Sequence, residues 1–114
     1  MQKILAGKKA IITGANQGFG FEIAKKYVQA GADVMLCARS PILLDAARAE
    51  LEAMATPGQK IVANVADVAS EEDVQILVAN TLKALGGCHI LVNNAGVYGP
   101  KGEIESVDWT EWVK

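Results

Sequence analysis

The chain has 114 residues and a mass of 12.0 kDa, which is enough for one compact domain and too little for two of ordinary size. Hydrophobic residues make up 51% of it and charged residues 21%, with a mean hydropathy of +0.20, which excludes disordered and collagen-like classes. A net charge of -2 offers no positive field for nucleic acid, and no apolar run reaches the roughly 18 residues of a membrane span.

The first strand and the first helix are predicted at the start of the chain. Residues 9–13 (KAIIT) form a short apolar run that stops at Gly14, as a buried strand does. An apolar stripe at helical spacing follows, and Gly31 is expected to cap the end of this helix. The stripe consists of Ile23, Ala24, Tyr27 and Val28.

A second strand and helix are predicted next. Residues 33–38 (DVMLCA) form the strand, and Pro41 lies near the first turn of a helix that closes before Pro57. The apolar stripe of this helix consists of Leu44, Ala47, Leu51 and Met54.

The third helix has the clearest signals. It lies between two further predicted strands, residues 60–64 (KIVAN) and 89–92 (HILV). Ser70 is a capping residue, and the acids Glu71, Glu72 and Asp73 follow it in the first turn. The apolar stripe consists of Val74, Leu77, Val78, Thr81, Leu82 and Leu85.

The four predicted strands are largely apolar rather than alternating, as expected for a parallel sheet covered on both faces. Strands that alternate with helices imply parallel pairing through right-handed crossovers. We therefore expect an α/β fold, a doubly wound parallel sheet of about four strands with helices on both faces, formed by residues 1–114 as one domain. Ligands bind such sheets at the carboxyl ends of the strands.

Three glycines lie between the first strand and the first helix, in the sequence TGANQGFG of residues 13–20. Gly14 permits a tight turn, whereas Gly18 and Gly20 allow backbone to approach a pyrophosphate and helix to approach sheet. Amide groups in the first helical turn add a site for phosphate oxygens. The pattern predicts dinucleotide binding, and the alternative is a tight turn without a ligand.

The spacing TGxxxGxG is joined by a second motif, NNAG at residues 93–96, after the fourth strand. Together the two motifs resemble those of the short-chain dehydrogenase/reductase family, and the resemblance extends over essentially all 114 residues. It implies a Rossmann-type NAD(P)-binding domain, the N-terminal, cofactor-binding half of an oxidoreductase.

The resemblance implies roles for the residues of both motifs. Contacts to the cofactor pyrophosphate and adenosine ribose are expected from Gly14, Asn16, Gln17, Gly18, Phe19 and Gly20. Phe19 replaces the usual Ile, and its backbone amide is the expected contact. After the fourth strand, the ribose beside the nicotinamide is expected to contact Asn94, Ala95 and Gly96.

The pair Asp67-Val68 resembles the family's pair beside the adenine ring, where the carboxylate accepts a hydrogen bond from the exocyclic amine. Asn64-Val65 is a competing match to the same motif. A further alternative is that Asp67 is only a loop or capping acid.

The end of the second strand bears on the choice between NAD and NADP. NAD enzymes of this fold place an acid there, which accepts from the ribose 2′-hydroxyl and repels a 2′-phosphate. Here Ala38 stands at that position. Arg39 can make a bidentate contact with a phosphate, and the hydroxyl of Ser40 can add a hydrogen bond to it. We therefore expect NADP(H), with NAD also possible because Gln17 stands where relatives carry a second basic residue. An Arg39 that is exposed and contacts no ligand is the alternative.

No catalytic residue can be assigned. The family uses a Ser, a Tyr-x-x-x-Lys pair and a downstream Asn, whereas Tyr98 and Lys101 are one residue too close for the pair. We therefore expect a parent protein about twice as long, with residues 1–114 inactive alone. The parent is expected to transfer hydride between NADP(H) and a carbonyl or alcohol substrate. A non-catalytic dinucleotide-binding module is the alternative function.

The two cysteines, Cys37 and Cys88, form no CxxC pair, and His89 is the sole histidine, so neither a disulfide framework nor a metal site is expected. Cys37 and His89 are expected to be structural. A reducing, cytoplasmic setting fits this cysteine usage, without nucleic-acid or membrane partners, and the full-length protein is expected to be a homo-oligomer.

Overall fold

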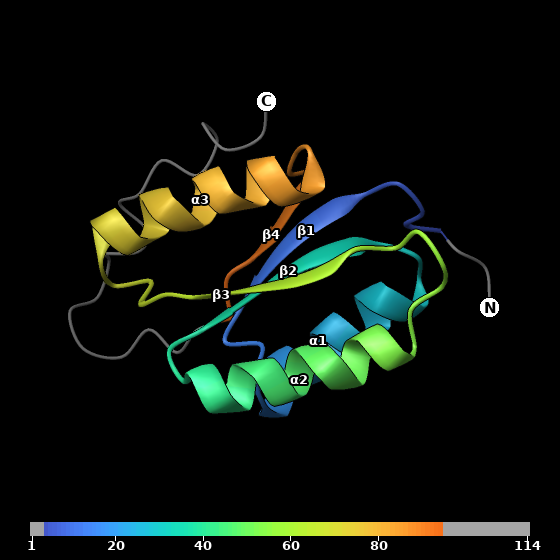
Figure 1. Ribbon diagram of the computed structural model, residues 1–114, viewed down its shortest axis with the longest axis horizontal. Helices are drawn as coiled ribbons and strands as arrows, with labels where there is room; N and C mark the ends of the chain where they lie inside the picture. Colours follow the sequence, from blue (N-terminus) through green and yellow to red (C-terminus); the bar gives the residue numbers. More distant parts are fainter. Residues whose placement is uncertain (1–3, 95–114) are drawn as a thin grey trace.

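The computed structural model describes residues 4–94, in which strands and helices alternate along the chain (Figure 1). The strands are β1 (Lys9–Thr13), β2 (Asp33–Ala38), β3 (Ile61–Val65) and β4 (Ile90–Val92). The helices are α1 (Gly18–Gln29), α2 (Pro41–Ala53) and α3 (Glu71–Leu85). The expected order of elements is confirmed, although β3 and β4 each begin one residue later than predicted.

All strand pairs in the described sheet are parallel, and the strand order is β3-β2-β1-β4. The chain therefore builds outward from β1 through β2 to β3 and then crosses to the other side of β1. This reversal leaves a switch point between β1 and β4, where open α/β sheets bind their ligands. Because the strands are parallel, their carboxyl ends meet at one edge of the sheet.

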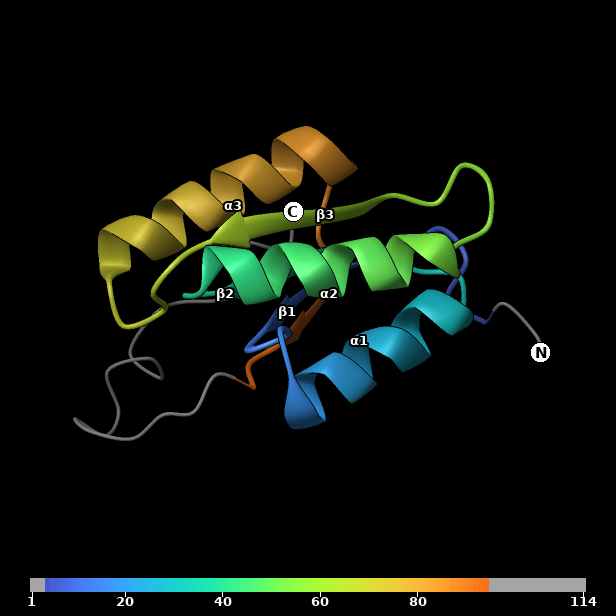
Figure 2. The same cartoon turned by 60° about the horizontal axis from the view of Figure 1, so that its bottom comes forward.

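Helices cover both faces of the sheet, as the apolar strands predict. Helices α1 and α2 lie on one face and α3 on the other, which is clear when the molecule is turned (Figure 2). On the α1 and α2 side, Ile12 and Leu36 pack with Val28 and Leu51. On the other side, Met35 and Cys37 pack with residues of α3 such as Leu77. β2 is buried at every position.

The helix ends agree with the signals in the sequence. Gly31, just beyond α1, has φ 98°, a left-handed conformation that glycine adopts without strain. The hydroxyl oxygens of Ser40 and Ser70 accept hydrogen bonds from the backbone amides of Leu43 and Asp73, at 3.3 and 3.2 Å. Both serines are thus N-caps, which fixes where α2 and α3 begin.

The predicted apolar stripe of α3 is wrong at one position. Val74, Leu77, Thr81 and Leu85 are buried, but Leu82 is 39% exposed. At about 100° per residue, Leu82 lies at the margin of the stripe rather than over the sheet. None of the helices within residues 4–94 is long and apolar enough to span a membrane.

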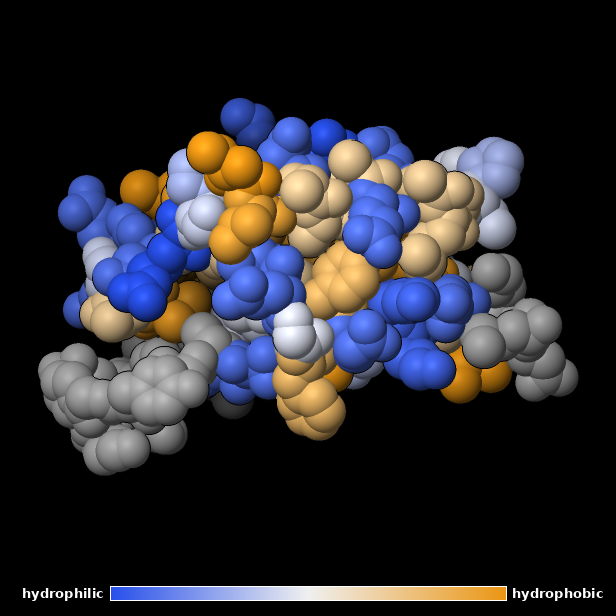
Figure 3. Space-filling model, turned by 90° about the horizontal axis from the view of Figure 1, so that it is seen from below, coloured by the Kyte–Doolittle hydropathy of each residue, from blue (hydrophilic) through white to orange (hydrophobic). Residues whose placement is uncertain are grey.

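The outer surface of the molecule on the α1 and α2 side is mixed in polarity. Figure 3 shows apolar and hydrophilic side chains next to one another on this face. The first turns of these helices contribute three exposed large apolar side chains, Phe19, Ile42 and Leu43. These first turns lie at the carboxyl edge of the sheet, where the candidate site is found.

Candidate functional site

The glycine turn leaves β1 through a left-handed backbone conformation. Gly14 has φ 62° and Gly18 has φ 60°, a region that other residues enter only with strain. Between them, the buried residue Ala15 donates its amide to the carbonyl oxygen of Cys37 at 3.2 Å. The turn is therefore held against the end of β2, and its geometry is the tight one that the sequence predicts.

Gly20 is required by close packing. A Cβ atom on Gly20 would lie 2.0 Å from the carbonyl oxygen of Gly14 and 2.6 Å from the side-chain nitrogen of Asn94. The first turn of α1 therefore touches both the exit of β1 and the residue that follows β4. This is the close approach of helix to sheet that the third glycine was expected to allow.

The amino end of α1 is exposed to solvent. Gln17 is the N-cap residue in an extended conformation, and its side chain makes no capping hydrogen bond. By helix geometry, the amides of Gly18, Phe19 and Gly20 have no acceptor within the helix. A Cβ added to Gly18 would meet nothing within 4 Å of it. The turn therefore offers backbone donors and open space, which is what a pyrophosphate requires.

Two other residues of the turn, Asn16 and Phe19, differ in exposure. Asn16 is half-buried within the turn. The side chain of Phe19 is 77% exposed, so the ring that replaces the usual Ile is not accommodated in the core. Its backbone amide remains in the open first turn of α1.

Thr13 joins the glycine turn to the end of β4. Its hydroxyl oxygen accepts from the backbone amide of Asn94 at 2.8 Å. The same hydroxyl lies 3.3 Å from the carbonyl oxygen of Val92 and 3.2 Å from Oδ1 of Asn93, so its hydrogen has an acceptor there. Sequence reasoning did not single out Thr13. The available signal was a hydroxyl at the end of an otherwise apolar strand.

The remaining residues of the second motif, Ala95 and Gly96, lie outside the described residues, as do Tyr98 and Lys101. Asn94 itself is placed at the switch point, beside Gly20 and Thr13. The structure thus brings one end of the NNAG motif against the glycine turn.

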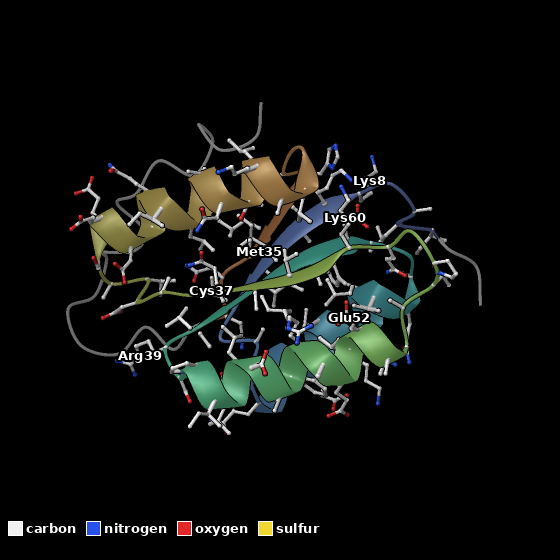
Figure 4. All side chains as sticks on the ribbon, viewed as in Figure 1. Lys8, Met35, Cys37, Arg39, Glu52 and Lys60 are labelled. Carbon is white, nitrogen blue, oxygen red and sulfur yellow. The ribbon has the colours of Figure 1, made fainter. Side chains whose placement is uncertain are left out.

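Arg39 and Ser40 follow β2 at the same edge of the sheet. Figure 4 shows Arg39 at the opposite end of the molecule from Lys8 and Lys60. Arg39 is exposed, and within residues 4–94 its guanidinium forms no hydrogen bond or ion pair. The hydroxyl oxygen of Ser40 accepts the hydrogen bond that caps α2, and the hydroxyl hydrogen can be donated to another acceptor.

The loop after β3 lies beside these residues, because the amide of Ala66 donates to the carbonyl oxygen of Ala38 at 3.0 Å. Asp67 Oδ1 accepts from the amide of Ala69 at 2.9 Å, so the loop role that was an alternative for Asp67 is observed. Within residues 4–94, Oδ2 of Asp67 accepts no hydrogen bond. Val68, half-buried, packs against the core on the α3 side.

The competing pair Asn64-Val65 lies farther back along β3. The side-chain nitrogen of Asn64 donates to the carbonyl oxygen of Val65 at 3.0 Å, and its Oδ1 accepts from the side chain of Asn80 on α3. Both ends of this amide are therefore engaged within the protein. Val65 is 50% exposed at the end of the strand.

The cysteines and the histidine have structural surroundings. Burial, together with the nearby negative charges of Asp73 and Asp67, raises the pKa of Cys37 to about 12. Burial also raises the pKa of Cys88. Nδ1 of His89 accepts a hydrogen bond of 3.0 Å from the backbone amide of Lys9, at the amino end of the sheet. The side chains of Cys37 and Cys88 pack in the core, and His89 joins the starts of two strands, so the structural roles predicted for Cys37 and His89 agree with their surroundings.

Comparison with known proteins places this geometry in a family. The model of the short chain dehydrogenase family matches residues 8–114. Glucose 1-dehydrogenase of Gluconobacter oxydans is 39% identical over 106 residues, which are 91% of this chain and 39% of that protein. The chain thus spans about two fifths of the length of such curated relatives.

Solved structures show the same fold. L-sorbose reductase from Gluconobacter frateurii, complexed with NADPH and L-sorbose, matches with a TM-score of 0.78 at 33% identity, over 98% of this chain and 42% of that chain. A short chain dehydrogenase/reductase from Burkholderia phymatum in complex with NAD matches with a TM-score of 0.75 at 35% identity, over 85% and 33% of the two chains.

Proposed function

The chain belongs to the short-chain dehydrogenase family, and on that premise we propose that it binds the nicotinamide dinucleotide of an oxidoreductase. The observation that carries this proposal is the glycine turn. It lies at the switch point of a parallel sheet, where Thr13 meets Asn94, and the amides at the start of α1 have no acceptor within the helix.

The residues of the carboxyl edge fit the parts of such a cofactor. The pyrophosphate is assigned to the amides of Gly18, Phe19 and Gly20, because they have no acceptor within helix α1. The adenine is assigned to Asp67 and Val68, and the ribose beside the nicotinamide to Asn94 with Ala95 and Gly96. When bound, the cofactor supplies or accepts the hydride, and these residues bind and orient it.

We propose NADP(H) as the preferred cofactor. No carboxylate directly follows β2 in the sequence, where Ala38 precedes Arg39, whose guanidinium has no partner within the described part of the chain. A 2′-phosphate beside the adenine would meet this guanidinium and the hydroxyl hydrogen of Ser40. The relatives include proteins crystallised with NADPH and with NAD, so the choice depends on these residues.

We propose that the intact protein transfers hydride between this cofactor and a carbonyl or alcohol. The named relatives are dehydrogenases and reductases, which favours this function over a non-catalytic dinucleotide-binding module. The 114 residues contain no Tyr-x-x-x-Lys pair, so proton transfer to the substrate oxygen is assigned to residues beyond them. Residues 1–114 alone are then expected to bind cofactor without turnover.

The proposal is tested by titrating the intact protein with NADPH and NADH and following the fluorescence of the nicotinamide. The wild type is expected to bind NADPH more tightly than NADH. Arg39→Ala should weaken NADPH binding by about 1.5 to 3 kcal/mol, the scale of a hydrogen bond to a charged group, and leave NADH binding unchanged. The difference arises because only NADPH carries the 2′-phosphate.

Arg48→Ala is the matched control, because Arg48 carries the same charge on α2 but is paired with Asp45 and Glu52 on its exposed face. This variant should bind both cofactors as the wild type does. Equal weakening of NADPH and NADH by Arg39→Ala, or tighter binding of NADH by the wild type, would contradict the NADP(H) assignment. Absence of binding to either cofactor would contradict the proposed function itself.

A further inference from the structure

We propose that Asp73, in the first turn of α3, is a positioning residue that holds the loop of residues 66–70 in the conformation that receives the adenine. The inference rests on the proposed function, because it assigns a role to a side chain behind the cofactor rather than in contact with it. It is carried by the hydrogen bonds that surround Asp67.

The backbone of Asp67 is held at both of its polar groups. Its amide donates to Oδ2 of Asp73 at 2.9 Å, and its carbonyl oxygen accepts from the amide of Ser70 at 2.8 Å. Ser70 in turn caps the helix by accepting the amide of Asp73. Asp73, Asp67 and Ser70 therefore form a closed ring of hydrogen bonds that joins the loop to the start of α3.

Asp73 supplies the amide of Asp67 with an acceptor outside the sheet. The sheet ends with the amide of Ala66, which donates to the carbonyl oxygen of Ala38, and the amide of Asp67 is the next one along the chain. This hydrogen bond is part-buried, so removal of the Asp73 carboxylate would leave the amide of Asp67 without its acceptor and should release the loop. The carboxyl group of Asp67, which is assigned to the adenine, would move with it.

Asp73 differs from its acidic neighbours. Glu71 and Glu72 are exposed, whereas Asp73 is half-buried. Its negative charge lies close enough to the sheet to raise the pKa of the buried Cys37. The three acids share the favourable end of the helix dipole, but within the described residues only Asp73 makes a side-chain hydrogen bond to the loop.

The test compares Asp73→Ala with Glu72→Ala, which removes the same charge from the same turn and leaves the loop contact intact. The probes are NADPH and 2′,5′-ADP, the latter carrying the adenosine end of NADPH without the nicotinamide. In the intact protein, Asp73→Ala should raise the dissociation constants of both probes by the same factor, about tenfold. Glu72→Ala should leave both constants at the wild-type value.

Two further variants separate positioning from folding. Asp73→Asn keeps an oxygen that can accept from Asp67, so it should restore both constants to within about threefold of wild type. Asp73→Glu keeps the charge and moves the carboxylate by one methylene, so it should weaken the binding of both probes. This variant keeps the test decisive if Asp73→Ala does not fold.

The outcomes distinguish this inference from the function on which it rests. Wild-type affinity in Asp73→Ala and Asp73→Glu would overturn the positioning role and leave the proposed function standing. Failure of Asp73→Asn to restore binding, in a variant that melts like the wild type, would also overturn it. A wild type that binds neither probe would overturn both.

Discussion

Gly18 and Gly20 are required for different physical reasons, although they are only two positions apart. Gly18 has φ 60° and open space around it, so a side chain there is strained but meets no atom. Gly20 lies against the carbonyl oxygen of Gly14, and a Cβ at 2.0 Å could be relieved only by moving backbone. In the proposed function Gly18 allows the ligand to approach, whereas Gly20 allows helix α1 to pack on the strand.

This difference predicts unequal effects on folding. Gly20→Ala should lower the free energy of unfolding by about 3 kcal/mol or more, the upper range for overpacking, because α1 must move away from β1. Gly18→Ala should lower it by about 1 to 2 kcal/mol, the cost of a left-handed conformation. Urea denaturation of both variants measures the two values. Equal effects, or a Gly20→Ala protein as stable as the wild type, would contradict the proposed packing.

Single residues also show where sequence reasoning ends. The caps Ser40 and Ser70 could be predicted because their partners lie three residues along the chain. The contact between Thr13 and Asn94 could not, because it joins residues 81 positions apart and depends on β1 and β4 being neighbours. The Asp73 contact required the geometry of the loop after β3, which no spacing in the sequence specifies.

At the scale of elements, the amino ends of the strands are joined by one acid. Asp33 Oδ2 lies 2.6 Å from Nζ of Lys9, and Oδ1 accepts from the amide of Lys60 at 2.9 Å, so the carboxylate connects the starts of β1, β2 and β3. Burial raises the pKa of Asp33, but the hydrogen bonds and charges of Lys9 and Lys60 outweigh it and hold the pKa below its ordinary value of 3.8.

The lowered pKa predicts a pH dependence of stability. The unfolded chain takes up this proton more readily than the folded one, so the stabilisation is present above pH 3.8 and is lost as pH falls through the lower folded value. At neutral pH, Asp33→Asn should lower the unfolding free energy by about 1 to 2 kcal/mol, between exposed and buried ion pairs. Urea denaturation at several pH values should show this difference shrinking below pH 3.8.

Asp45→Asn is the control, because Asp45 pairs with Arg48 on the surface and its side chain is 74% exposed. Its stability should follow the wild type closely over the same pH range. A difference between the wild type and Asp33→Asn that stays constant down to the lowest pH at which the protein folds would show that the charge of Asp33 is not involved.

The helices and strands themselves were largely predictable from the sequence, because apolar periodicity and caps are local. β1 and β2 have the predicted bounds, and Pro41 opens α2 as expected. β3 begins after Lys60 because the amide of Lys60 donates to the side chain of Asp33 rather than to a strand. Leu82 was misassigned because the margin of an apolar stripe is decided by how the helix is rolled against the sheet.

For the whole molecule, the alternation of strands and helices predicted a parallel sheet, but not its strand order. That β4 pairs with β1 rather than with β3 is a tertiary property, and it creates the switch point where the glycine turn and Asn94 meet. The motifs indicated the site because they encode local backbone shape. The substrate was not predictable, because the residues assigned to the site are proposed to contact the cofactor and none is assigned to the substrate.

Hydrogen exchange of the intact protein, followed by mass spectrometry with and without saturating NADPH, tests whether the glycine turn binds the pyrophosphate. We expect the amides of residues 13–20 to exchange more slowly with cofactor, because Gly18, Phe19 and Gly20 then donate to the pyrophosphate. The exchange rates of residues 45–53, in the C-terminal part of α2, should not change. Binding of NADPH without slower exchange in residues 13–20, or with slower exchange only in other segments, would contradict the assignment of the pyrophosphate to the glycine turn.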